Sequence, residues 1–165
     1  MISVIDIDIE REARWLRAIA RSNEDPIPRG IALRICCGQG DASRLLQRLY
    51  REIELVAPLL ARDREVVQLL FAGGADDALS QEQRSELRRS LARNFCLAEA
   101  IERGGASAAA APDAGAQAMD ILGLGPGASS RFGEVTAINA SDSDAYCCAL
   151  DAGHLPVIDC VAAPA

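Results

Sequence analysis

Two short apolar runs, each followed by a segment with helical periodicity, constrain the fold of this chain most strongly. The first run covers residues 31–37 and the second covers residues 65–71. Apolar residues then recur at helical spacing within 43–60 and within 80–95. The order strand, helix, strand, helix predicts an α/β fold with a parallel sheet, because parallel strands need a long crossover connection.

Capping residues support both helices. Asp41 or Ser43 can cap the first helix, and Pro58 is expected to end or kink it. Ser80, with Gln83 three residues later, matches a capping box at the start of the second. We expect that second helix to continue through residue 95, as far as residue 101.

The charged face of the first helix is predicted to point outward. Arg48 and Glu52 are four residues apart, a spacing that places both side chains on one side of a helix. We therefore expect both of them on the solvent-exposed face. Upstream, residues 2–9 alternate as a short strand would, and residues 10–22 have helical periodicity with Trp15 on the apolar side.

The composition changes near residue 104. Residues 104–118 contain eight Ala and three Gly, which indicates a linker or a weak helix. Beyond it we expect strands at 119–124, 135–138 and 155–161, a turn-rich stretch at 123–133, and a helix over 141–150 closed by Gly153. The predicted organisation is a βα region over 1–103, a linker over 104–118, and a segment over 119–165 that packs on the same domain.

Charge narrows the possible partners. The net charge is −7, every one of the 17 basic residues is Arg, and residues 104–165 carry one Arg against seven acidic residues. Nucleic-acid binding requires a basic patch, so neither nucleic acid nor an anionic membrane is an expected partner. With no apolar run of about 20 residues and no signal peptide, we expect a cytoplasmic protein. A chain of 165 residues is also too short for a complete eight-stranded α/β barrel.

Six cysteines are expected to be reduced thiols in that compartment. Cys147, Cys148, His154 and Cys160 could form a zinc site, but their spacing matches no known pattern, so packing is the preferred interpretation. Residues 123–127, GLGPG, could cradle a phosphate, but the residues at 129–139, SSRFGEVTAIN, predict turn and strand rather than the helix that such a cradle should open. The acidic residues Asp142, Asp144, Asp151 and Asp159 are expected at the surface. No residue is assigned a catalytic role.

Four collinear segments resemble the oxygen-independent coproporphyrinogen III oxidases, the radical-SAM enzymes of haem biosynthesis. These segments are ARSNEDPIPRGIALRI (20–35), RLYREIELVAPLL (48–60), REVVQLLFAGGADDALSQEQRSELRRSL (64–91), and the whole stretch from DILGLGPGASSRFG to GHLPV (120–157). They cover most of this chain but only about a third of such an enzyme. The resemblance implies a fragment of a radical-SAM-type barrel: two βα units and a small C-terminal α+β segment, in a mainly parallel sheet.

The cluster loop of that family is the clearest departure. In the family the first strand leads into a CxxxCxxC loop whose cysteines bind three irons of a [4Fe–4S] cluster, and S-adenosylmethionine binds the fourth iron. Here only Cys37 matches, at the last cluster position, with Cys36 at the position of a preceding aromatic and Gln39 in place of a further cysteine. The resemblance assigns Cys37 to the metal, but we expect neither the cluster nor S-adenosylmethionine to be bound by this chain.

The second family motif is also altered. The GGGTP turn that holds the methionine end of the cofactor corresponds to residues 72–76, AGGAD. Gly73 and Gly74 still allow close backbone approach and are the predicted cofactor-binding residues, whereas Asp76 places an acid near a carboxylate-bearing ligand.

The family reaction is the oxidative decarboxylation of coproporphyrinogen III to protoporphyrinogen IX. We predict a degenerate homologue that lacks this activity as a single chain. Two alternatives stay open. One is a non-catalytic module that binds haem, porphyrin or cofactor, with His154 or a cysteine as axial ligand. The other is a structural remnant that associates with itself through open sheet edges.

Overall fold

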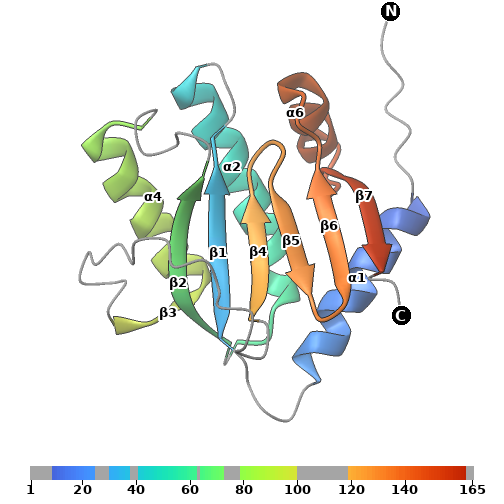
Figure 1. Ribbon diagram of the computed structural model, residues 1–165. Helices are drawn as coiled ribbons and strands as arrows, with labels where there is room; N and C mark the ends of the chain where they lie inside the picture. The colour runs from blue at the N-terminus through green and yellow to red at the C-terminus, as the bar shows by residue number, and fades with distance from the viewer. Residues whose placement is uncertain are drawn as a thin grey trace, which may run out of the picture.

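The fold is one seven-stranded sheet with helices against it (Figure 1). The computed structural model describes residues 9–24, 30–37, 41–62, 64–72, 79–99 and 119–162. The strand order is β3-β2-β1-β4-β5-β6-β7. The predicted strand at 2–9 lies outside the described residues, apart from Ile9, which begins a helix, and the predicted linker at 104–118 lies wholly outside them.

The predicted βα units form the parallel half of the sheet. Strand β1 (Ile31–Cys36) leads into helix α2 (Ala42–Val56), and β2 (Glu65–Ala72) leads into helix α4 (Gln81–Asn94). Asp41 caps α2 by accepting a hydrogen bond from the Ser43 amide at 2.9 Å. Pro58 lies in a short 3₁₀ helix, η1 (Ala57–Leu59), directly after α2, so the prediction that it ends the helix is confirmed. The capping box of Ser80 and Gln83 is present.

The predicted end of the helix after Ser80 is wrong. Helix α4 stops at Asn94, and Phe95 has the extended conformation, with φ −126° and ψ 154°. The next two residues form β3 (Cys96–Leu97), which pairs in parallel with the start of β2. Phe95 itself is buried, so packing of this side chain overrides the continuing helical periodicity.

The C-terminal segment extends the same sheet on the other side of β1. Strand β4 (Asp120–Leu124) pairs in parallel with β1, and β5 (Ser129–Phe132), β6 (Val135–Asn139) and β7 (Val157–Ala162) follow in antiparallel order. Helix α6 (Ser143–Asp151) connects β6 to β7. The strand β5 is not among the predicted strands, because it lies within a stretch whose glycines and serines indicate turns.

The described helices all lie on one face of the sheet (Figure 1). Helix α1 (Ile9–Asn23) packs on β5, β6 and β7, while α2 contacts β4, α4 and α6. The largest fully buried side chains lie in these layers: Trp15, Ile19, Ile31, Leu33, Ile35, Leu49, Ile53, Leu87, Leu91, Leu122, Phe132 and Tyr146. In the wall of an α/β barrel the helices likewise cover only one face of the sheet, where they form the outer layer. The predicted α/β class with a partial barrel is confirmed. The sheet, which was expected to be mainly parallel, is mixed: among the described strands three pairings are parallel and three are antiparallel.

The opposite face has no helix among the described residues, and side chains on it are partly exposed. Ile138 on β6 and Val161 on β7 are 38% and 54% exposed. The two edges of the described sheet are β3, which is only two residues long, and β7. Self-association through an open edge stays a prediction, for which β7 is the longer candidate. Within the described ranges, no helix has the length and apolar character needed to cross a membrane.

Candidate functional site

The carboxyl ends of three parallel strands meet where the sequence predicts the cofactor site. Strands β1 and β2 end in register, with Cys36 opposite Ala72, and β4 ends beside them at Leu124. Gly125 follows at once, and a Cβ atom there would lie 1.9 Å from the Cys36 carbonyl oxygen. Its φ of +104° also favours glycine. The backbone of the C-terminal segment is therefore in close contact with the end of β1.

The predicted metal ligand, Cys37, follows β1 with a buried side chain that belongs to the main hydrophobic core. Burial raises the pKa of its thiol, and the neighbouring Cys36 adds to the effect. Burial also raises the pKa of Cys36, with Arg34 acting against the shift and Glu52 adding to it. A raised pKa disfavours the thiolate form that binds metals. Gly73 and Gly74, the predicted cofactor-binding residues, lie outside the described residues.

A buried carboxylate lies beside this junction. Glu52 of α2 is 2% exposed and accepts three hydrogen bonds from the C-terminal segment. The Gly125 amide donates to its Oε2 atom at 2.8 Å, the Tyr146 hydroxyl donates to the same atom at 2.5 Å, and Asn139 donates to Oε1 at 2.7 Å. Asn139 also donates to the Gly125 carbonyl at 3.1 Å. One side chain thus connects the β4–β5 turn, β6 and α6 to the first βα unit.

The environment of Glu52 changes its acidity. Burial raises its pKa from 4.5 to about 7, and the hydrogen bonds from Tyr146, Gly125 and Asn139 oppose that shift. Tyr146 is also buried, and both burial and the charge of Glu52 raise its pKa well above the usual range. We call these four residues the Glu52 cluster.

The predicted outward orientation of Glu52 is wrong. Glu52 is buried, while Arg48 pairs instead with Asp151 near the surface. Glu52 is three residues after Leu49 and four before Val56, and both of these residues are buried on α2. This spacing is the signal that could have placed Glu52 on the apolar side of the helix.

A second cluster of buried polar side chains lies at the opposite end of the sheet, where β2 and β4 begin. Arg64 and Asp120 form an ion pair at 2.7 Å with both side chains 4% exposed. Ser22 of α1 accepts from Arg64 at 2.7 Å and donates to Asp120, and the Gly133 amide donates to Asp120 at 2.9 Å. Burial acts to raise the pKa of Asp120, but the hydrogen bonds from Ser22, Arg64 and Gly133 outweigh it and the pKa is lowered.

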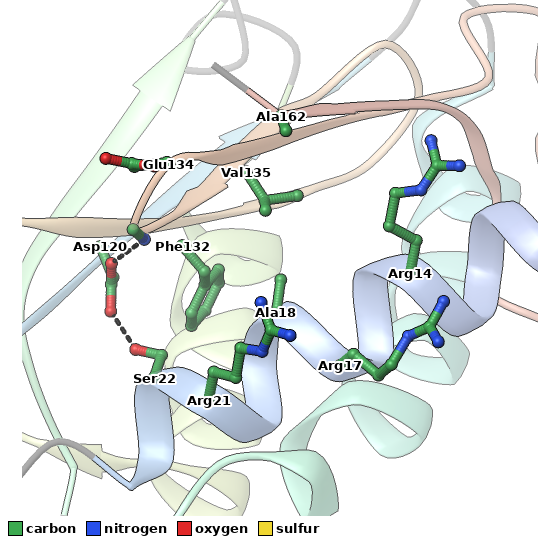
Figure 2. Close-up of a pocket in the computed structure, with 11 residues that line it drawn as sticks. Arg14, Arg17, Ala18, Arg21, Ser22, Asp120, Phe132, Glu134, Val135 and Ala162 are labelled. Carbon is green, nitrogen blue, oxygen red and sulfur yellow. Dashed lines mark hydrogen bonds between the residues drawn. The ribbon is translucent and has the colours of Figure 1, made fainter. Parts of the chain in front are cut away.

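A cavity of about 580 Å³ opens next to this ion pair, between α1 and the β5–β6 hairpin (Figure 2). Its apolar wall includes Phe132, which makes an edge-to-face contact with Trp15 at 5.1 Å between ring centroids. Arginines of α1 line the other side. The complete lining is Arg14, Arg17, Ala18, Arg21, Ser22, Asp120, Phe132, Gly133, Glu134, Val135 and Ala162.

The remaining sequence candidates occupy ordinary structural positions. The glycine-rich stretch 123–127 turns β4 into β5 and is followed by strand rather than helix, as predicted. His154 lies 3.0 Å from Glu12 through its Nδ1 atom. Cys147 and Cys160 are buried and Cys148 is exposed. The acidic residues Asp142, Asp144, Asp151 and Asp159 are all exposed.

The described residues do not fit a [4Fe–4S] cluster. Cubane clusters are held by several converging thiolates. The cysteines that the structure describes at the end of β1 are the adjacent Cys36 and Cys37, and these two thiols are fewer than the three that the family's cluster loop supplies. Within the described ranges, no three His, Cys, Asp or Glu side chains are grouped to hold a metal ion.

The fold places this chain among α/β proteins in which the helices lie on one side of the sheet, as in the wall of an α/β barrel. Comparisons with protein family models and with curated proteins found no match. Among solved structures, the chain is similar to coproporphyrinogen III oxidase (HemN) from Escherichia coli, which is described as a radical SAM enzyme. The TM-score is 0.74 at 14% identity, and the match covers 93% of this chain and 75% of that chain, a larger share than the third expected from the four resembling segments. At this identity the likeness shows a radical-SAM-like fold.

Proposed function

We propose that this chain is a degenerate relative of the oxygen-independent coproporphyrinogen III oxidases, without their radical chemistry. The observation that carries the proposal is the packing at the end of β1. Cys37 belongs to the hydrophobic core, and Gly125 lies against the Cys36 carbonyl. Among the described residues, the buried Glu52 cluster lies beside this strand end and links it to the C-terminal segment.

The open face of the sheet also supports a non-catalytic role. The family reaction would have to act on a tetrapyrrole enclosed by protein, and desolvation of an active site strengthens its electrostatic interactions. Here Ile138 and Val161 on the open face keep 38% and 54% of their surface exposed. The described residues therefore offer a surface on this side rather than an enclosure.

The direct test is anaerobic incubation of the chain with S-adenosylmethionine and dithionite after iron and sulfide reconstitution. We expect no 5′-deoxyadenosine above the level given by a Cys37→Ala variant, since reductive cleavage needs the cluster. The Escherichia coli enzyme serves as the positive control. Formation of 5′-deoxyadenosine that disappears in Cys37→Ala would overturn the proposal.

A second candidate, haem binding, is favoured by one observation. Histidines that ligate metals commonly donate their other ring nitrogen to a carboxylate, which orients the ring. Glu12 lies 3.0 Å from Nδ1 of His154, whose side chain is 40% exposed. Its Nε2 atom is then the nitrogen available for an axial bond.

Titration with haemin tests this candidate. If His154 is an axial ligand, a sharpened Soret band is expected in the native chain and is lost in His154→Ala. Glu12→Gln should weaken haemin binding by roughly 10- to 100-fold, because it removes the orienting carboxylate. The matched control is Glu54→Gln, an exposed glutamate on α2. Spectra of native chain and His154→Ala that coincide would exclude the candidate.

A further inference from the structure

The cavity between α1 and the β5–β6 hairpin has the dimensions and the lining of a ligand site. Its volume of about 580 Å³ falls within the range of roughly 300–1,000 Å³ usual for small-molecule pockets. It lies at the amino ends of β1 and β4, the opposite end of the sheet from Cys37, and on the helix-covered face. It is thus separate from the strand ends where the sequence predicts the cofactor site.

Three arginines of one helix face the cavity. Arg14, Arg17 and Arg21 are three and four residues apart, so they form one row along α1. The row spans about 10 Å, since each residue of a helix rises about 1.5 Å. Arg14 is held toward β7 by a hydrogen bond to the Cys160 carbonyl at 3.1 Å, whereas the side chains of Arg17 and Arg21 bond to no residue that the structure describes.

The rest of the lining distinguishes this row from an ordinary solvated helix face. Ala18, Phe132, Val135 and Ala162 supply an apolar wall within the same cavity (Figure 2). The carboxylate of Asp120 is already neutralised by Arg64. Glu134 lies across the cavity from Arg14 and Arg17. In a chain of net charge −7, these groups leave a local excess of positive charge beside an apolar surface.

We propose that this cavity binds a small organic molecule with an apolar body and two anionic groups, carboxylates or phosphates. The anionic groups are held by Arg17 and Arg21, because guanidinium groups bind both kinds of oxyanion through paired hydrogen bonds. The apolar body lies against Phe132 and Val135. Glu134 repels anionic groups from the hairpin end and so sets the orientation of the ligand.

Naphthalene-1,5-disulfonate is a suitable probe, because it combines a flat apolar body with two permanent anions. Binding is measured by isothermal titration calorimetry, and the site is located by amide shifts in NMR spectra. We expect the largest shifts at Ala18, Gly133 and Ala162. Inorganic sulfate and an uncharged naphthalene alcohol, which each supply only half of the chemistry, are expected to bind at least about tenfold more weakly.

Variants that remove equal charge at different places test whether Arg17 and Arg21 bind the probe. Arg17→Gln with Arg21→Gln should weaken disulfonate binding at least about tenfold, since each charge-assisted contact contributes on that scale. The control removes two exposed arginines elsewhere, Arg44→Gln with Arg89→Gln, and should leave affinity unchanged. Glu134→Gln should tighten binding. Thermal melting of each variant establishes that it is folded, and all four arginines are exposed, so folding is expected to be retained.

Three results would overturn the proposal. The first is equal affinity in the two double variants, which would mean that only net charge attracts the probe. The second is the absence of binding at millimolar probe, and the third is amide shifts remote from α1 and the β5–β6 hairpin. None of these results bears on cluster assembly at Cys37, so the proposed function is tested separately.

Discussion

Glu52→Leu is expected to lower the free energy of unfolding by about 2–4 kcal/mol, because it leaves buried donors without their acceptor. Gly125, Asn139 and Tyr146 all donate to the Glu52 carboxylate inside the protein. Leucine supplies a similar volume but accepts no hydrogen bond. Urea denaturation followed by circular dichroism measures the loss.

Glu54→Leu is the matched control on the same helix. The Glu54 side chain is 63% exposed, and it pairs with Arg51 only at 3.5 Å. Its replacement should change stability by no more than about 0.5 kcal/mol. A Glu52→Leu variant as stable as Glu54→Leu would show that the Glu52 cluster does not hold the C-terminal segment to α2.

The stability that Glu52 contributes should also depend on pH. Its pKa is about 7 in the folded chain, against 4.5 for the free group. Between these values the folded state binds the proton more tightly than the unfolded state, so the contribution is largest below pH 4.5 and falls as pH rises toward 7. The stability of the native chain relative to Glu52→Gln should fall by about 3 kcal/mol over this interval. A constant difference would contradict the raised pKa.

Arg64→Met should be the most destabilising change at the other end of the sheet, at about 3–5 kcal/mol. It leaves the carboxylate of Asp120 buried without its cation. Asp120→Asn added to Arg64→Met should recover part of the loss, since it removes the uncompensated charge. Denaturant titrations of the single and double variants measure both effects.

A surface pair provides the comparison for Arg64. Arg48 and Asp151 are in contact, with side chains 32% and 51% exposed, and Arg48→Met should cost less than about 1 kcal/mol. If Arg64→Met cost no more than Arg48→Met, the buried ion pair would be irrelevant to folding.

Both buried clusters join the same two parts of the chain. Glu52 and Arg64 come before residue 100, whereas Gly125, Tyr146 and Asp120 come after residue 118. One cluster lies at each end of the β1–β4 junction. The C-terminal segment is therefore held along β1 by backbone pairing and at both ends by polar side chains. We therefore expect the two parts to unfold cooperatively.

Much of the fold could be predicted from local sequence patterns. Residues 31–36 and 65–72 are strands, and the capping residues Asp41 and Ser80 begin the helices that follow them. These features depend on neighbours in the chain. The end of α4 and the strand β5 could not be predicted in the same way, because pairing with distant strands determines them.

Less of the candidate site could be predicted from the sequence. Cys37 could be singled out by resemblance, but its burial depends on packing across the sheet. The role of Glu52 depends on three donors that are 73 to 94 residues further along the chain. The cavity on α1 likewise needs the β5–β6 hairpin, whose strand β5 was missed. These features share one cause. Each depends on residues far apart in the sequence, and local spacing does not predict which distant residues will be in contact.

The count of iron and sulfide bound per chain tests the central claim most directly. The claim is the proposal that this chain, with a radical-SAM-like fold and with Cys37 buried in the hydrophobic core, holds no iron–sulfur cluster. After anaerobic reconstitution and desalting, we expect iron and sulfide near zero, and no difference between the native chain and Cys37→Ala. About four irons and four sulfides per chain, reduced in Cys37→Ala, would contradict the account.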